Sequence, residues 1–289
     1  MRPIQAKTIL SSARNPPDPY FGGLYNINLY RGCPHGCIYC DTRSDCYGIG
    51  DLSDLRYKDN ALAILDDELG RRRRKGTVTT GSMNDPYQPW ERRLKLTRGA
   101  LKLMAAHGFG VHVITKGNLV ARDADVLRRV GRVYAAVSFT VTTTDSDLAR
   151  VIEPGAPPPE LRFRAMARLA RAGIYTGLTF MPVLPFITDT PENVRAVLEQ
   201  ASAHGARYAI FFPGMTLRDS CRAHYYAQLD KHFPGLKERS IHAYGNQYGC
   251  DSPRADELWR AYSKTCSGLG LATRMRFYEP PRQEQLSLL

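Results

Sequence analysis

Short runs rich in apolar and β-branched residues alternate with longer amphipathic runs from residue 26 to residue 211, and this alternation restricts the fold more than any other feature. Alternating strands and helices predict an α/β fold in which helices cover a parallel sheet. Both an open sheet and a curled, barrel-like sheet satisfy the pattern. The expected strands are 26–30, 77–80, 111–115, 134–140, 175–180 and 208–211, and the expected helices are 60–74, 91–107, 122–130, 161–172 and 191–203.

The segments that follow the expected strands are polar or rich in loop-forming residues. The first strand is followed by RGCPHGC, the second by GSMNDPYQPWE and the third by KGN. In parallel sheets the loops that leave the carboxyl ends of the strands carry the functional groups. We therefore expect the functional face at this end of the sheet.

Three cysteines lie close together in the first of these loops, YRGCPHGCIYCDTR. Cys33, Cys37 and Cys40 supply three thiolates, and the glycines around them let the backbone approach a bound group. Three thiolates on a four-iron cluster leave one iron free to bind another molecule. Two alternatives stay open, because Cys46 or His35 offers a fourth ligand for zinc and Cys46 offers one for a closed cluster.

The chain divides into three expected regions. Residues 1–23 contain NPPDPYFGG, whose prolines and glycines oppose helix and strand and predict an irregular N-terminal arm. Residues 24–215 form the expected core. Residues 216–289 continue with helical patterns at 217–231 and 255–267. We expect this C-terminal extension to pack on the core, because no low-complexity linker separates the two.

Lysine and arginine exceed aspartate and glutamate by 12, which favours polyanionic partners such as nucleic acid. Solubility is the alternative explanation, since the densest run, 71–75, stands where a helix is expected to end and cations complement the helix dipole. No run of about 18 apolar residues and no export signal is present, so we expect no membrane partner. With an odd number of cysteines, seven, these features predict a cytoplasmic protein without a disulfide framework.

The spacing C-x3-C-x2-C, with Tyr39 before the last cysteine, resembles the signature of the radical S-adenosylmethionine (SAM) superfamily. The resemblance implies a partial (β/α)6, TIM-like barrel of parallel strands and a [4Fe–4S] cluster on Cys33, Cys37 and Cys40. It also implies SAM at the open iron and an external one-electron reductant of the flavodoxin or ferredoxin type. In that family the reduced cluster cleaves SAM to a 5′-deoxyadenosyl radical, which abstracts a hydrogen atom from the substrate.

Within the superfamily, GSMNDPYQPWE, Lys116 and Ser138 resemble the spore photoproduct lyase branch. The resemblance implies that Ser82, Lys116 and Ser138 contact the carboxylate, amino group or ribose of SAM. Tyr39 and Asp85 complete the expected cofactor-binding set. An exposed loop position for Lys116, a buried hydroxyl for Ser138 and a helix-capping role for the polar cluster around Asp85 are the structural alternatives.

The chain departs from that branch at residue 81. The lyase carries a cysteine there that returns a hydrogen atom to the product radical, whereas this chain has Gly81. Repair of a thymine dimer is therefore not implied. Cys250, in the turn-rich segment NQYGCDSP, is the best substitute hydrogen donor, although most lone cysteines are packing residues.

Aromatic residues of the C-terminal extension, such as Tyr225 and Tyr226, are interleaved with basic residues such as Arg218 and Arg222. Residues of these types stack on bases and neutralise phosphates, and core packing explains many of the aromatic ones equally well. The resulting prediction is a radical SAM enzyme with a candidate nucleic-acid substrate. The alternative is a nucleic-acid-binding protein without catalysis, held together by zinc or by a closed cluster.

Overall fold

The computed structural model describes residues 1–12 and 20–279. Its main sheet contains β2 (Leu10–Ser12), β3 (Tyr25–Ile27), β6 (Thr77–Thr80), β7 (Gly110–Thr115), β8 (Ala135–Thr140), β9 (Tyr175–Phe180) and β10 (Ala209–Phe211). The strand order is β10-β9-β8-β7-β6-β3-β2, and β2 alone runs antiparallel to its neighbour. Within the described residues the edge strands β2 and β10 do not pair. The sheet is therefore an open partial barrel, and the predicted α/β fold is confirmed.

The first expected strand, 26–30, is divided between two sheets. β3 ends at Ile27, whereas Tyr30 belongs to β4 (Tyr30–Arg31). A second sheet has the order β1-β5-β4, with β1 at Arg2–Ile4 and β5 at Arg56–Lys58. β1 and β2 both lie within residues 1–23, where we expected an irregular arm. β1 pairs with β5, which is far away along the chain, whereas β2 pairs with the next strand, β3; local composition indicates neither partner.

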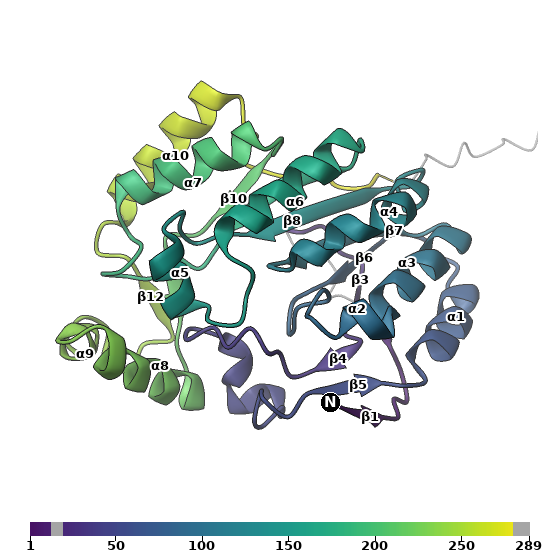
Figure 1. Cartoon of the computed structure of the whole chain (residues 1–289), viewed down its shortest axis with the longest axis horizontal. Helices are drawn as coiled ribbons and strands as arrows, with labels where there is room; N and C mark the ends of the chain where they lie inside the picture. Colours follow the sequence, from purple (N-terminus) through teal and green to yellow (C-terminus); the bar gives the residue numbers. More distant parts are fainter. Residues whose placement is uncertain (13–19, 280–289) are drawn as a thin grey trace, which may run out of the picture.

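Helices cover the outer side of the main sheet (Figure 1). The expected helix 91–107 is two helices, α2 (Glu91–Leu94) and α3 (Leu96–Ala106), because Lys95 between them is left-handed, with φ 54°. The Glu91 carboxylate accepts hydrogen bonds from the amides of Thr97 and Arg98, so it caps α3. The other covering helices are α1 (Ala61–Arg71), α4 (Ala124–Val130), α6 (Pro159–Arg171) and α7 (Pro191–Ala203).

The chain after residue 213 adds a hairpin and three helices to one end of this core. β11 (Gly214–Thr216) pairs antiparallel with β12 (Gly249–Asp251), and α10 (Ala255–Leu269) packs along α7. α8 (Asp219–His232) and α9 (Leu236–Tyr244) lie beside each other (Figure 1). α9 and α5 (Ser146–Ile152) lie outside the predicted helices. No helix in residues 1–12 and 20–279 is long and apolar enough to cross a bilayer.

Alternation along β8 and β9 separates the hydrophobic core from the barrel interior. Val137, Phe139, Leu178 and Phe180 are fully buried in the main core cluster. The alternate residues of both strands face the interior of the barrel. At the level where Ser138 pairs with Gly177, the interior is filled by the ring of Tyr208, which a Cβ on Gly177 would contact at 2.4 Å. Thr140 pairs with Thr179 one step nearer the carboxyl ends, where a cavity begins.

Candidate active site

A cavity of about 550 Å³ opens at the carboxyl ends of β3, β6, β7, β8 and β9. This is the end of the sheet at which the sequence places the functional groups. Backbone and side chains from the cysteine loop, from the β6 loop and from the end of β7 form most of its wall. The predicted site residues that line it are Cys33, Cys37, Tyr39, Cys40, Ser82, Asp85 and Lys116.

The cysteine loop is held on two sides by backbone hydrogen bonds. The amide of Cys33 donates to the carbonyl of Leu52 at 3.1 Å. On the other side, the segment 152–155, which follows α5, makes two bonds: the Ile38 amide donates to Ile152 O at 3.0 Å, and the Gly155 amide donates to His35 O at 2.8 Å. The hydrogen bonds of the protein backbone therefore fix the path of the loop between two parts of the chain.

The three thiols of this loop fit a polynuclear cluster. All are free, and burial raises the pKa of Cys33 to about 12 and raises that of Cys37 as well, so bound cations are needed to keep these sulfurs as thiolates. Among the described residues, no three His, Cys, Asp or Glu side chains converge as ligands of a single ion. Ligands of a cluster occupy separate irons and stand farther apart than ligands of one tetrahedral ion. The arrangement of the described residues is therefore compatible with a cluster.

The two proposed fourth ligands lie in different places relative to the cavity. Cys46 is exposed and does not line the cavity, and its Sγ accepts hydrogen bonds from Ser44 Oγ at 3.2 Å and from Arg218 Nη1 at 3.4 Å. His35 does line the cavity, and its Nδ1 faces Asp85 Oδ2 at 3.6 Å. The three thiols therefore share the cavity wall with His35 but not with Cys46.

A buried network of charges stands behind Cys37. The hydroxyl of Tyr39 donates to Glu153, whose other carboxylate oxygen lies 2.5 Å from Arg162 Nη1. Lys116 Nζ lies 4.0 Å from Glu153 Oε1 and 5.5 Å above the ring of Tyr39.

The pKa values in this network show which groups stay charged. Burial lowers the pKa of Lys116, but Cys37 and Glu153 raise it more, so the pKa lies above its ordinary value. Burial raises the pKa of Glu153, but Arg162 and Lys116 hold it below the usual range. Lys116 is therefore a fixed cation on the cavity wall, suited to a carboxylate ligand.

Asp85 and Ser82 line the same cavity in different ways. Asp85 accepts hydrogen bonds from Thr115 Oγ1 and from the Lys116 amide, each at 2.6 Å, so this carboxylate ties the β6 loop to the end of β7. Ser82 is exposed, and its Oγ donates to Asn26 Oδ1 at 3.3 Å. Of the two, the Ser82 hydroxyl is the more available to a ligand.

Ser138 lies below the cavity, and its contact with the cofactor stays a prediction. It is fully buried below the cavity, and its Oγ lies 2.7 Å from both His112 Nε2 and the hydroxyl of Tyr208. It is not part of the cavity wall. The side chain does point into the barrel, but the ring of Tyr208 covers that level, so the structure supports the buried-hydroxyl alternative.

Cys250 also lies outside the cavity wall. It sits in β12 rather than in a turn, it is fully buried, and its Sγ donates to Gln247 O at 3.7 Å. Its register partner Met215 does line the cavity. The role of Cys250 as hydrogen donor stays a prediction, and it requires a path past Met215.

Gly81 leaves no room for the side chain that is missing there. Its φ is +104°, and a Cβ built on it would stand 2.0 Å from the carbonyl oxygen of Ile114. The backbone of β7 therefore excludes any side chain, a thiol included, from this position in the present conformation.

Sequence reasoning missed Glu153, Arg162 and Thr179. Glu153 and Arg162 meet Tyr39 only through the fold, since 114 residues separate Tyr39 from Glu153. Thr179 lines the cavity, is buried, and has an Oγ1 without a hydrogen-bond partner among the described residues. The polar residue between apolar neighbours in GLTF was the available signal for Thr179, because strand residues alternate between two faces.

Comparison with known sequences gives relatives of two kinds. An uncharacterized protein of Mycobacterium tuberculosis is 34% identical over 223 residues, which make up 74% of this chain and 65% of that protein. The chain thus spans less than two thirds of that relative's length. A radical SAM Nalpha-GlyT isomerase of Pseudomonas phage M6 is 25% identical over 193 residues, which cover 66% of this chain and 40% of the isomerase.

Solved structures share the fold. A spore photoproduct lyase variant superposes with a TM-score of 0.71 at 15% identity, covering 94% of this chain and 80% of that chain. Another variant of the lyase, with bound AdoMet and dinucleoside spore photoproduct, gives 0.69 at 14% identity, with the same coverage.

The sequence model of the radical SAM superfamily matches residues 27–215. This stretch holds the cysteine loop and all the parallel strands of the main sheet except the first residues of β3. Members of the superfamily use a [4Fe–4S] cluster and SAM, so the cofactor prediction is confirmed at the level of the family. Together, the matched region, the open parallel barrel and the three-thiol loop show that this chain belongs to the radical SAM superfamily.

Proposed function

We propose that this protein is an enzyme that holds a [4Fe–4S] cluster on Cys33, Cys37 and Cys40 and binds SAM beside it. The cluster, when bound, supplies the electron that cleaves SAM to a 5′-deoxyadenosyl radical, which takes a hydrogen atom from the substrate. The observation that carries the proposal is the meeting of three free thiols and the fixed Lys116 cation on one cavity wall.

The chain's own groups would bind and orient the cofactor. Lys116 would pair with the SAM carboxylate, and the Ser82 hydroxyl, beside Asn26, would bind a polar group such as a ribose hydroxyl. Tyr39, which lines the cavity, would contact the cofactor and, with Glu153, would keep Lys116 in position. The apolar residues of the wall, among them Phe21 and Met181, would exclude water from the reacting centre.

Nucleic acid is the proposed substrate class, and an external one-electron reductant of flavodoxin or ferredoxin type is the proposed redox partner. The net charge of +12 supports a polyanion, and a lyase structure with this fold holds a dinucleoside. Because Gly81 leaves no space for a thiol, we propose a reaction other than the lyase's dimer repair. We propose a cytoplasmic location.

Anaerobic purification and reconstitution test the enzymatic proposal. We expect a brown protein that binds iron and sulfide and, after reduction, forms 5′-deoxyadenosine from SAM. Lys116→Met should lower SAM affinity while iron content stays unchanged, and exposed Lys102→Met should alter neither. A colourless protein that retains one zinc ion would overturn the proposal in favour of the non-catalytic alternative.

A further inference from the structure

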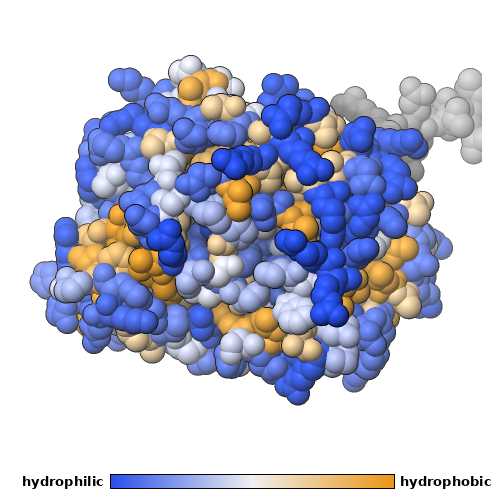
Figure 2. Space-filling view, in the orientation of Figure 1, coloured by the Kyte–Doolittle hydropathy of each residue, from blue (hydrophilic) through white to orange (hydrophobic). Residues whose placement is uncertain are grey.

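Basic side chains concentrate at the end of the barrel opposite the cavity. The loops and last helical turns that lead into β6, β7, β8, β9 and β10 form what we call the amino-end face. Figure 2 shows mostly hydrophilic residues over α1, α3 and α4, which end at this face. Its exposed cations include the run 71–74, Arg128, Arg129, Arg132, Arg171 and Arg207.

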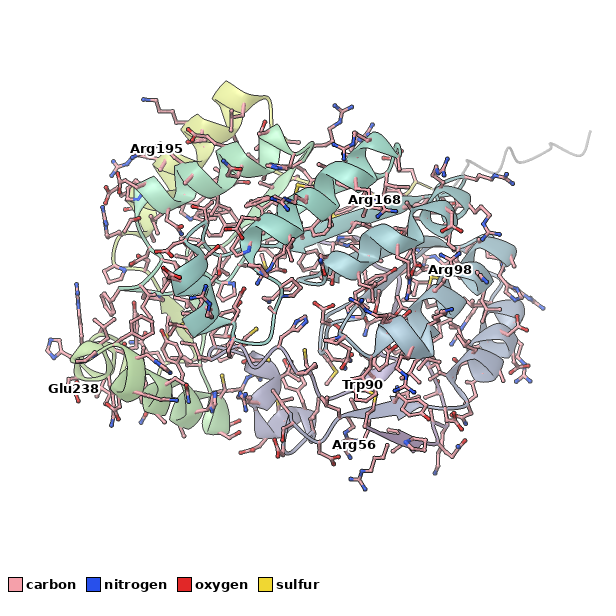
Figure 3. All side chains as sticks on the ribbon, viewed as in Figure 1. Arg56, Trp90, Arg98, Arg168, Arg195 and Glu238 are labelled. Carbon is pink, nitrogen blue, oxygen red and sulfur yellow. The ribbon has the colours of Figure 1, made fainter. Side chains whose placement is uncertain are left out.

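Three arginines of the carboxyl-end side and five of the amino-end face differ in their ion pairs. At the carboxyl-end side, Arg150, Arg195 and Arg254 each pair with a carboxylate three residues away, at 2.5–2.8 Å. At the amino-end face, Arg71 pairs with Asp67, but within the described ranges Arg128, Arg129, Arg132, Arg171 and Arg207 have no carboxylate within 4.0 Å. Figure 3 shows Arg195 and Arg168 toward opposite ends of the helical layer.

The helix dipole accounts for only some of these cations. Its field falls off within the last turn of a helix, so it favours residues such as Arg129 and Arg171. Arg73, Arg132 and Arg207 lie beyond the helix ends, in the connecting loops. Like charges without counter-ions repel one another and destabilise the fold, so a bound polyanion is the partner that this face fits.

A groove on the same face adds aromatic rings to the charge. It measures about 440 Å³ and is lined by Arg128, Tyr134, Tyr175, Arg276 and Tyr278, with one acidic residue, Glu279, among the others. The Arg276 guanidinium lies 5.0 Å over the ring of Tyr175, and the rings of Tyr134 and Tyr278 are 6.5 Å apart. Arginine and aromatic side chains in a basic groove are suited to stacking on bases as well as to neutralising phosphates.

We propose that the amino-end face binds single-stranded nucleic acid, with the arginines on phosphates and the groove on bases. The surface lies at the other end of the strands from the cysteine loop, so the inference goes beyond the proposed function and does not depend on SAM cleavage. A nucleic acid held there would be anchored outside the cavity.

Fluorescence anisotropy with labelled single-stranded DNA of about 20 nucleotides tests this surface. The variant Arg128→Ala/Arg129→Ala/Arg132→Ala should bind the DNA at least about tenfold more weakly. The slope of its log affinity against log salt concentration should become shallower by about 2. The matched control Arg150→Ala/Arg195→Ala/Arg254→Ala removes the same charge from paired positions and should change affinity by less than about twofold.

Equal losses in the two triple variants would overturn the proposal, because net charge alone would then explain binding; an unchanged amino-end variant would overturn it too. Tyr278→Ala should weaken binding of the DNA but not of heparin, which has no bases. If this variant binds the DNA as well as the unchanged protein does, or if the unchanged protein prefers anionic vesicles to DNA, the proposal is contradicted. SAM cleavage without nucleic acid should be the same in all variants, and its absence in every one of them would count against the proposed function only.

Discussion

Lys116 Nζ and Glu153 Oε1 face each other at 4.0 Å across the base of the cysteine loop, joining the end of β7 to the segment after α5. Glu153 is 1% exposed and also binds Arg162, which is equally buried. A cation at the cavity wall is thus part of a buried network rather than a flexible surface lysine. Removal of the Glu153 carboxylate should therefore destabilise the whole fold.

Glu153→Ala should lower the free energy of unfolding by about 3–5 kcal/mol, because it leaves the Arg162 guanidinium buried without its partner. Urea unfolding followed by circular dichroism measures this. The control is Glu192→Ala, which breaks the exposed pair with Arg195 and should cost less than about 1 kcal/mol. Similar losses in the two variants would mean that the buried network is not a structural element.

Gly81→Ala should cost about 1–3 kcal/mol beyond the cost of the left-handed backbone, because the new Cβ meets the carbonyl of Ile114. Gly173→Ala is the matched control, since Gly173 has φ +79° and, in the described part of the chain, no atom stands within 4 Å of the place that its new methyl group would take. That control should lose about 1 kcal/mol. Thermal melts compare the stability of the two variants. Equal losses of stability would show that the backbone of β7 at Ile114 moves easily to make room for the new methyl group.

Stability should fall as pH falls, in part because of His112. Burial lowers the pKa of His112 to about 3, so between about pH 6.5 and pH 3 the unfolded chain binds a proton that the folded chain does not. This adds up to about 1.4 kcal/mol of lost stability per pH unit in that window. His112→Gln should flatten the slope of unfolding free energy against pH, and exposed His242→Gln should leave it unchanged. An unaltered slope in His112→Gln would contradict the buried neutral state.

Ser138 and Ser82 should respond in opposite ways to replacement by alanine. Ser138→Ala removes a hydrogen-bond partner from His112 and from Tyr208, and should cost about 1–3 kcal/mol of stability without changing SAM affinity. Ser82→Ala should keep stability within about 0.5 kcal/mol and weaken SAM binding. Thermal melts and equilibrium dialysis with SAM separate the two effects. Weaker SAM binding in Ser138→Ala alone would restore the expectation that Ser138 contacts the cofactor.

Cys40→Ser should lose most of the iron after anaerobic reconstitution, because a cluster with two thiolates is poorly held. Cys46→Ser should retain it, since the Cys46 thiol points to Ser44 and Arg218. Iron and sulfide analyses, with absorbance in the visible range, give the readout. Loss of iron in both variants would indicate a four-thiolate centre and would remove the open iron.

The sequence pattern predicted two strands accurately, each of them a short run between loop-forming segments. β6 and β9 have the predicted bounds, because short apolar runs between loop-forming residues leave little choice of register. Three features were not predicted: β1, whose partner β5 is far away along the chain, β2, which is only three residues long, and the break at Lys95, which depends on a single left-handed residue. Periodicity indicates which face of a helix or strand a residue occupies. It gives much less information about the residue at which the helix or strand starts.

The site shows the same limit. Cys33, Cys37 and Cys40 are close in sequence, so their spacing alone indicated their place on the cavity wall. Ser138 has the inward orientation that its strand predicts, but sequence does not tell how deep along β8 the cavity begins, and Tyr208 fills that level. Contacts such as Tyr39 with Glu153 join segments 114 residues apart, and no single-sequence pattern links them.

The grip on the cysteine loop by Ile152 O and the Gly155 amide uses main-chain atoms only. These two hydrogen bonds do not depend on side chains, so the side chains beside them can change during evolution while the bonds persist. Two positions of the segment are exceptions: a Cβ on Gly155 would stand 2.1 Å from Pro34 O, and Glu153 forms the buried ion pair with Arg162. Evolution is thus left with two constrained positions in that segment.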